Sequence, residues 1–238
     1  MDYPKLKFKI DYKKDVKTFF AFNNEAGFDD GRNLKWAILR KYPQFNKYKK
    51  GNKLNISEKM VSDFVRSVYL KNRKVIRENI SLYQKNWLKI EKDYFLLVDD
   101  IFDGYPWPKG KYIIYPTIWG MYPRFLEDKM FQIPYKYKNE RYVSVIIAHE
   151  MLHFMFYDHI YKKFPKFKNN RYNFDIWHLS EIFNDIIQNS PSWLKIFKKK
   201  TMAYPEHKKY LPKMRKLWRE TQDIDKWLIK AHKYLQKR

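Results

Sequence analysis

The feature that most constrains this chain is a largely apolar run, residues 142–157, with three ionisable side chains in its middle. Most positions of the run other than His149, Glu150 and His153 are apolar, which is the pattern of a helix buried on all sides. Burial of an unpaired charge is costly, so such groups are expected to be paired or to bind a metal. The sequence therefore predicts a buried helix that carries a polar site.

The spacing of these three residues favours a metal. Positions i and i+4 share one face of a helix, so the imidazoles of His149 and His153 can converge on one ion, at roughly 2.0–2.1 Å from each nitrogen. Glu150 lies beside that ion without pointing at it, where a general base for a metal-activated water belongs. The alternative is a pair of core histidines satisfied by hydrogen bonds, which places three costly groups in one turn without a ligand.

A catalytic zinc site usually has three protein ligands and one open position, so a third ligand is expected. A second apolar helix, predicted over 177–187, carries Glu181 and, four residues later on the same face, Asp185. One of them can bind the metal while the other accepts a hydrogen bond from the far nitrogen of a ligand histidine. The alternative third ligands are His159 and His178.

The motif His149-Glu150-Met151-Leu152-His153 is the signature of the zincin metallopeptidases, and the chain resembles this superfamily over about residues 94–190. Glu181 and Asp185 are similar to the downstream Glu-x-x-x-Asp of its gluzincin branch. The resemblance implies zinc bound by His149, His153 and Glu181, with Asp185 as a partner in the second layer. It also implies hydrolysis of peptide bonds with Glu150 as the general base. The candidate donors to the oxyanion of that reaction are Tyr157, Tyr204 and His207.

The metzincin branch is the rival resemblance. The distance from His149 to His159 fits its longer motif, and Met202-Ala203-Tyr204 is similar to its Met-turn. The glycine that this motif requires is Phe156 here, and a phenylalanine is disfavoured in the left-handed conformation that ends the helix. We therefore expect the helix to continue through Phe156 and to carry His159 away from the metal.

The remaining patterns predict an α+β fold with additional helices at both ends. The resemblance implies that this fold is zincin-like, with a small mixed sheet packed on the buried active-site helix. Alternation predicts a strand over 5–10, and short apolar runs predict strands over 94–98, 112–115 and 130–135. A helical period follows Ser57, a candidate N-cap, for about thirty residues, as one helix or two. Helices are also expected over 15–22 and 34–41 and twice after residue 209, and a turn-rich loop over 23–31.

The chain is long enough for one large domain, and we expect a single compact domain with three regions. These are a mostly helical N-terminal region over 1–90, a zincin-like catalytic core over 91–200, and basic helices over 201–238.

The net charge of +24 favours nonspecific attraction of nucleic acid. Only 11 of the 50 basic residues are Arg, whereas a base-reading protein concentrates Arg, so a solvated lysine surface explains the charge as well. The absence of cysteine excludes disulfides and thiolate metal sites and suits a reducing compartment. Without a signal-peptide pattern or a membrane-length apolar run, a cytoplasmic protein is expected.

Two other functions are compatible with this sequence. One is a basic nucleic-acid-associated protein with a structural metal site, and the other is an inactive zincin scaffold that binds a partner. The charge supports the first and the high aromatic content, 19%, supports the second.

Overall fold

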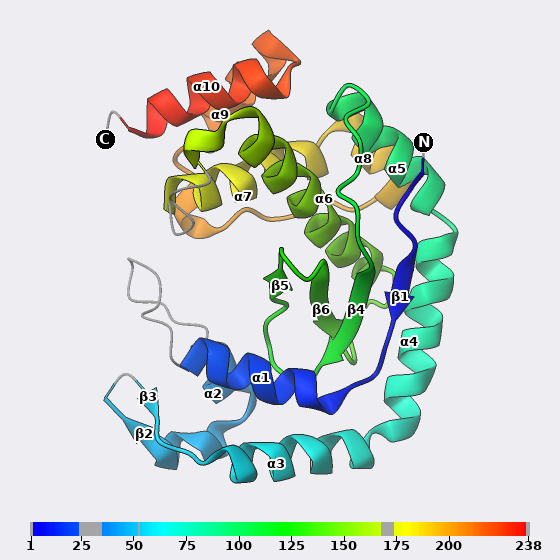
Figure 1. Cartoon of the computed structure of the whole chain (residues 1–238), viewed down its shortest axis with the longest axis vertical. Helices are drawn as coiled ribbons and strands as arrows, with labels where there is room; N and C mark the ends of the chain where they lie inside the picture. The colour runs from blue at the N-terminus through cyan, green and yellow to red at the C-terminus, as the bar shows by residue number, and fades with distance from the viewer. Residues whose placement is uncertain (1, 24–34, 52, 168–173, 237–238) are drawn as a thin grey trace. The chain divides into compact units, whose positions relative to one another are not determined.

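The computed structural model describes residues 2–23, 35–51, 53–167 and 174–236. It divides into two compact units. The sheet unit comprises Pro4–Asn86 and Gly110–Val143, and the motif unit comprises Met1–Tyr3, Trp87–Lys109 and Ser144–Arg238. The fold is mixed α+β, with many helices and a small mixed sheet (Figure 1).

The sheet has the strand order β1-β4-β6-β5. Strands β1 and β6 run parallel to β4, and β5 is antiparallel to β6, so the sheet is mixed as expected. Three predicted strands are confirmed, and the full set is β1 (Leu6–Phe8), β4 (Tyr112–Thr117), β5 (Arg124–Phe125) and β6 (Met130–Pro134). Its predicted packing on the motif helix stays a prediction.

The helices of the first third of the chain follow the predicted periods. They are α1 (Tyr12–Asn23), α2 (Lys35–Lys41), α3 (Glu58–Lys71) and α4 (Arg73–Leu88), with the 3-10 helix η1 (Pro43–Tyr48) and the hairpin β2 (Lys49–Lys50) and β3 (Lys53–Leu54) between them. Ser57 is the N-cap of α3, since its hydroxyl accepts the Met60 amide at 3.3 Å. The helical period after Ser57 is therefore two helices. The loop predicted over 23–31 lies, from residue 24 on, outside the described residues.

A buried carboxylate joins the elements of the sheet unit. Asp15 on α1 accepts hydrogen bonds from Tyr69 of α3 at 3.0 Å, from the Ile118 amide at 2.9 Å and from Gln132 of β6 at 2.8 Å. Its side chain is fully buried, and burial raises its pKa to about 6 despite these bonds. Through these hydrogen bonds Asp15 links α1 to α3, to β6 and to the residue that follows β4. Above about pH 6 the buried carboxyl is charged, so these links then carry an electrostatic cost.

The strand predicted over 94–98 is wrong, because these residues lie in α5 (Glu91–Ile101) of the motif unit. Tyr94, Leu97 and Val98 are buried while Leu96 is half exposed, which is the spacing of a helix with one buried face. A five-residue apolar run fits a buried strand and a buried helix equally well. The acids Glu91 and Asp93 in the first turn favour the helix.

Helix α6 (Tyr142–Lys163) carries the motif and continues through Phe156, as predicted. The second apolar helix is confirmed as α7 (Phe174–Gln188), and the two basic helices as α9 (Leu211–Thr221) and α10 (Ile224–Leu235). An additional helix, α8 (Pro191–Phe197), begins where Ser190 caps it and a proline occupies its first turn. A 3-10 helix, η3 (Pro205–His207), precedes α9.

Helix α7 is the centre of the motif unit. It packs against α8, α9 and α10. The ring of Phe183 lies 5.3 Å from Phe156 of α6, 5.4 Å from Trp218 of α9 and 5.3 Å from Trp227 of α10. Phe156, where the rival motif needs glycine, is therefore a core residue that joins the two motif-bearing helices.

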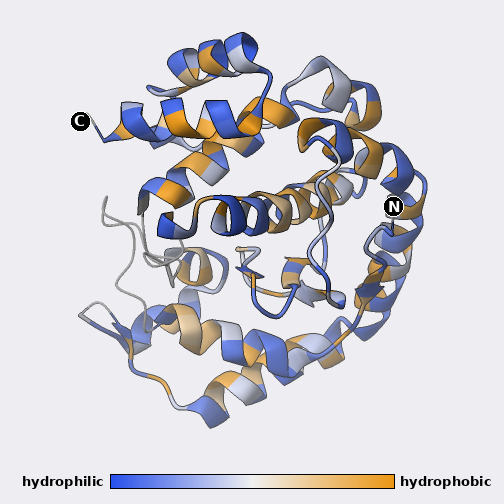
Figure 2. Ribbon diagram, turned by 45° about the horizontal axis from the view of Figure 1, so that its top comes forward, coloured by the Kyte–Doolittle hydropathy of each residue, from blue (hydrophilic) through white to orange (hydrophobic). Residues whose placement is uncertain are grey.

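The helices near the C-terminus alternate polar and apolar residues, as Figure 2 shows in blue and orange. Their buried residues repeat at helical spacing, with Leu211, Met214 and Leu217 in α9 and Trp227, Leu228 and Ala231 in α10. Across the described part of the chain, every helix is too short or too polar to cross a membrane.

Candidate metal centre

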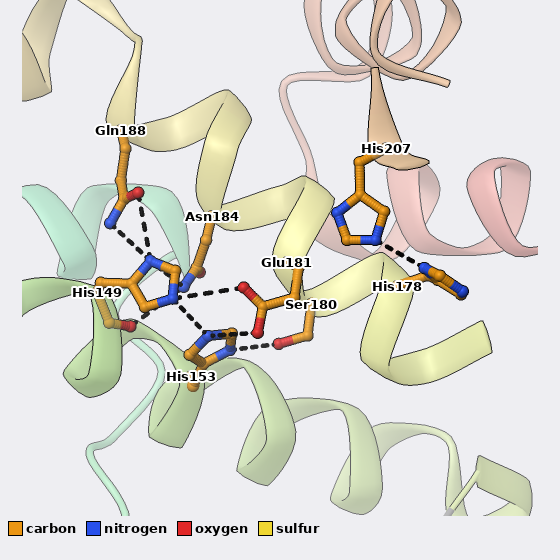
Figure 3. A network of polar contacts seen from close by, with 8 residues as sticks. All are labelled: His149, His153, His178, Ser180, Glu181, Asn184, Gln188 and His207. Carbon is orange, nitrogen blue, oxygen red and sulfur yellow. Dashed lines mark hydrogen bonds and ion pairs between the residues drawn. The ribbon is translucent and has the colours of Figure 1, made fainter. Parts of the chain in front are cut away.

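Two helices bring three potential metal ligands together. His149 and His153 lie one turn apart on α6, and Glu181 of α7 faces both imidazoles (Figure 3). Their ligand atoms all lie within 4.8 Å of one another. Among the described residues, these three form the cluster of His and Glu side chains that could hold a metal ion. His153 and Glu181 are buried, and a quarter of the His149 side chain is exposed. The site is thus buried but reaches solvent at His149.

The separations within this group match a tetrahedral ion. The Nε2 atoms of His149 and His153 are 3.0 Å apart. Glu181 places one carboxylate oxygen 3.4 Å from Nε2 of His149 and the other 3.3 Å from Nε2 of His153. Two atoms that each lie 2.0–2.1 Å from a tetrahedral zinc are about 3.3 Å apart, so the group needs little adjustment to hold such an ion.

The outer nitrogens of the two histidines have partners of their own on α7. Nδ1 of His153 lies 2.5 Å from the Ser180 hydroxyl. Nδ1 of His149 lies 3.0 Å from the Gln188 amide nitrogen and 3.3 Å from its carbonyl oxygen, and Asn184 donates to the His149 carbonyl at 3.1 Å. In the tautomer in which each Nδ1–H donates to the Ser180 hydroxyl or the Gln188 carbonyl oxygen, each Nε2 presents a lone pair to the centre.

This arrangement places two imidazole lone pairs and a carboxylate at one buried point. Such groups repel one another unless a proton or a cation lies between them. Two neutral histidines and one carboxylate also form a ligand set that zinc uses in catalytic sites. The residues present therefore fit a divalent metal, and His149, His153 and Glu181 can bind one.

The partner predicted for a ligand histidine, Asp185, has a different role. Its carboxylate accepts a hydrogen bond from Arg215 of α9 at 2.7 Å and one from Asn189 at 3.2 Å. Burial raises the pKa of Asp185, and the Arg215 guanidinium opposes that rise. Asp185 joins α7 to α9, whereas Ser180 and Gln188 contact the ligand histidines.

The two alternative third ligands lie in other contacts. His159 is buried on α6, and its Nε2 lies 2.7 Å from Asp225 of α10, which also pairs with Lys163. Nδ1 of His178 on α7 lies 2.6 Å from Nε2 of His207 (Figure 3). His159 therefore links the C-terminal part of α6 to α10 through Asp225, and His178 contacts His207.

Glu150 directly follows the first ligand on α6, and only 5% of it is exposed. Of the three expected oxyanion donors, Tyr157 lies one turn beyond His153 with its ring 6.2 Å from that imidazole. Tyr204 and His207 form a ring cluster with Trp177, whose ring is 5.7 Å from Tyr204 and 5.4 Å from His207. Of the motif residues, Glu150 and His153 are buried and His149 is partly exposed. The choice of the oxyanion donor stays open among Tyr157, Tyr204 and His207.

Sequence reasoning missed the supporting residues of the site, although they leave a signal. Ser180, Asn184 and Gln188 repeat every four residues, so they form one stripe along α7 that faces α6. All three are buried in a helix that is otherwise largely apolar. A polar stripe at this spacing predicts hydrogen bonds to a neighbouring helix.

Comparison of the chain with known proteins gives no match to a protein-family model, to a curated protein or to a solved structure.

Proposed function

We propose that this chain is a zinc-dependent metallopeptidase with His149, His153 and Glu181 as its metal ligands. The proposal is carried by one observation, the convergence of two imidazole nitrogens and a carboxylate at separations of 3.0, 3.3 and 3.4 Å. The order of residues on α6 adds support, since the buried Glu150 lies between the two ligand histidines. Both features are also what the zincin resemblance implies.

The zinc, when bound, supplies a Lewis acid that polarises a substrate carbonyl and lowers the pKa of water to near 7. The protein's own residues supply positioning and proton transfer. The oxygens of Ser180 and Gln188 lie where they can accept the Nδ1–H of His153 and His149, which would leave both Nε2 atoms available to the metal. Glu150 takes a proton from the attacking water at its carboxylate and delivers it to the leaving amine.

The substitution Glu150→Gln tests this proposal, because it removes the base and keeps the size of the side chain. We expect the variant to retain its zinc and to lose turnover of peptides, with a fall in kcat of at least about a hundredfold. The exposed Glu140, nine residues before His149, gives the matched control Glu140→Gln, which should retain both zinc and activity.

Elemental analysis and cleavage of a mixed peptide library, read by mass spectrometry, check both properties on the same preparations. Undiminished peptide cleavage by the zinc-containing Glu150→Gln protein would refute the assignment of the base. A wild-type protein that binds zinc but cleaves no peptide would instead support the scaffold function.

A further inference from the structure

The segment between α8 and η3, residues 198–204, has no helix or strand and is called the connector below. Two contacts join this part of the chain to α7 and to the residue directly after it. In the middle of the connector, the Thr201 amide donates to the Asn189 side chain at 3.3 Å, and Asn189 donates back to the Thr201 hydroxyl at 3.2 Å. Three residues beyond the connector, Nε2 of His207 in η3 lies 2.6 Å from Nδ1 of His178 (Figure 3).

These anchors set the course of the connector. Asn189 directly follows α7, and its amide still donates to the Asp185 carbonyl, so it lies eleven residues and about 16 Å along the helix axis from His178. The six steps from Thr201 to His207 can cover about 20 Å when fully extended. The chain from Thr201 to His207 therefore runs along α7 in the antiparallel direction, and Thr201 lies beside the end of α7 that carries Gln188.

The anchors also place the connector on one side of the metal ligand. At about 100° per residue, His178 and Asn189 lie about 60° and 80° around α7 from Glu181 in one direction. The residues that face α6, which are Ser180, Asn184 and Gln188, lie about 100°, 60° and 20° from Glu181 in the other direction. Glu181 thus lies between α6 on one side and the connector on the other.

The connector begins with three lysines, Lys198, Lys199 and Lys200, and all three are exposed. Within the described ranges they form no ion pair. Lys200 directly precedes Thr201, which is hydrogen-bonded to Asn189. The residue before Asn189 is Gln188, whose amide contacts His149, and His149 is the candidate ligand through which the site reaches solvent. The three lysines therefore belong to the segment that contacts the chain directly after Gln188, next to the partly exposed His149.

Charge within the motif unit is distributed unevenly along the chain. Residues 87–109 and 144–190, which include the three ligands, contain 8 basic and 10 acidic residues, whereas residues 191–238 contain 15 basic and 4 acidic ones. The positive excess of this unit therefore comes entirely from the part of the chain that begins with α8 and the connector. A field of one sign beside a site raises the local concentration of ligands of the opposite sign.

We propose that the connector is a substrate-binding segment and that Lys198, Lys199 and Lys200 select polypeptides with acidic side chains close to the cleaved bond. This inference rests on the proposed peptidase function and adds its substrate class. A polypeptide is favoured over a nucleic acid because the run is short and contains no arginine, whereas a phosphate backbone is usually held by a longer track of contacts. Acidic side chains need only a few lysines at one edge of the site.

The test is the sequence preference of cleavage in a random peptide library, for wild type and for the triple variant Lys198→Gln/Lys199→Gln/Lys200→Gln. Wild type should enrich Asp and Glu within a few positions of the cleaved bond. In the triple variant, kcat/KM for an acidic peptide should fall about tenfold, because each exposed ion pair contributes at most about fivefold. A neutral peptide of the same length should be cleaved at an unchanged rate.

Three exposed lysines of the sheet unit supply a charge-matched control, Lys59→Gln/Lys71→Gln/Lys85→Gln, which should keep the acidic preference. Reversal of charge gives a second readout, since Lys199→Glu/Lys200→Glu should prefer peptides with Lys or Arg. Glutamine and glutamate keep the Cβ and much of the length of lysine, so exposed positions should tolerate them.

Each result separates this inference from the function on which it rests. Cleavage without acidic preference, or a preference that the control removes as strongly as the triple variant, overturns the inference and leaves the peptidase intact. Absence of all cleavage by the zinc-containing wild type overturns both. A last experiment measures, by fluorescence anisotropy, the binding of labelled oligoglutamate and of a labelled DNA duplex to wild type and to the triple variant. If the connector lysines matter for the duplex and not for oligoglutamate, the segment binds nucleic acid and the inference is wrong.

Discussion

Replacement of Ser180 by alanine should weaken metal binding although Ser180 is not itself a ligand. Its hydroxyl lies 2.5 Å from Nδ1 of His153, and both side chains are fully buried. Without this oxygen, the Nδ1–H of His153 has lost its acceptor in a place that water does not reach, which costs about 1–3 kcal/mol. We expect Ser180→Ala to lower zinc affinity by about 10- to 100-fold, which equals about 1.4–2.7 kcal/mol.

Gln188→Ala is the matched comparison, because Gln188 serves the other histidine in the same way. Its carbonyl oxygen lies 3.3 Å from Nδ1 of His149, a longer contact than that of Ser180. A quarter of the His149 side chain is exposed, so water can replace the lost acceptor. The loss of zinc affinity should therefore stay below about tenfold.

Competition with a chromogenic chelator measures both affinities at neutral pH without requiring any enzyme activity. The account predicts that Ser180→Ala costs more than Gln188→Ala. Equal zinc affinities for wild type and Ser180→Ala would contradict this account, as would a larger loss for Gln188→Ala. Either result would show that the hydrogen bonds at Nδ1 do not orient His149 and His153 for metal binding as inferred.

Two further predictions concern stability in urea. Burial raises the pKa of Asp15 from 3.8 to about 6, so its stabilising contribution is present below about pH 4 and is lost as the pH rises through 6, by about 3 kcal/mol in all. Asp15→Asn should remove this part of the pH dependence, and a constant stability difference between wild type and variant from pH 4 to pH 8 would contradict it. Arg215→Ala leaves the buried Asp185 carboxylate without its cation and should destabilise by about 1–3 kcal/mol at pH 7. Asp185→Asn should cost less, and the reverse order would count against the pairing.

The sequence identified the candidate metal ligands because their pattern depends on one helix at a time. His149 and His153 share a face through the helical repeat, and Phe156 correctly indicated that α6 continues beyond them. Glu181 followed from an acid embedded in a second apolar helix. These features are local, and local spacing is what a single sequence records.

The errors arose where the outcome depends on neighbours in space. Residues 94–98 form a helix because their buried face packs within the motif unit, and an apolar run of that length does not distinguish helix from strand. Asp185 was predicted to support a histidine, yet Arg215, thirty residues away in the sequence, lies 2.7 Å from it. Ser180 and Gln188 take the predicted role because their stripe faces α6, and that orientation follows from how two helices pack.

Metal content tests the central claim most directly. Elemental analysis of protein purified without chelator should find one zinc per chain in wild type. Glu181→Ala should lose that zinc, whereas His159→Gln should retain it, because His159 pairs with Asp225 and not with the ligand group. A wild-type protein that carries no zinc and cannot be loaded with it would contradict the account, as would retention of zinc by Glu181→Ala together with its loss from His159→Gln.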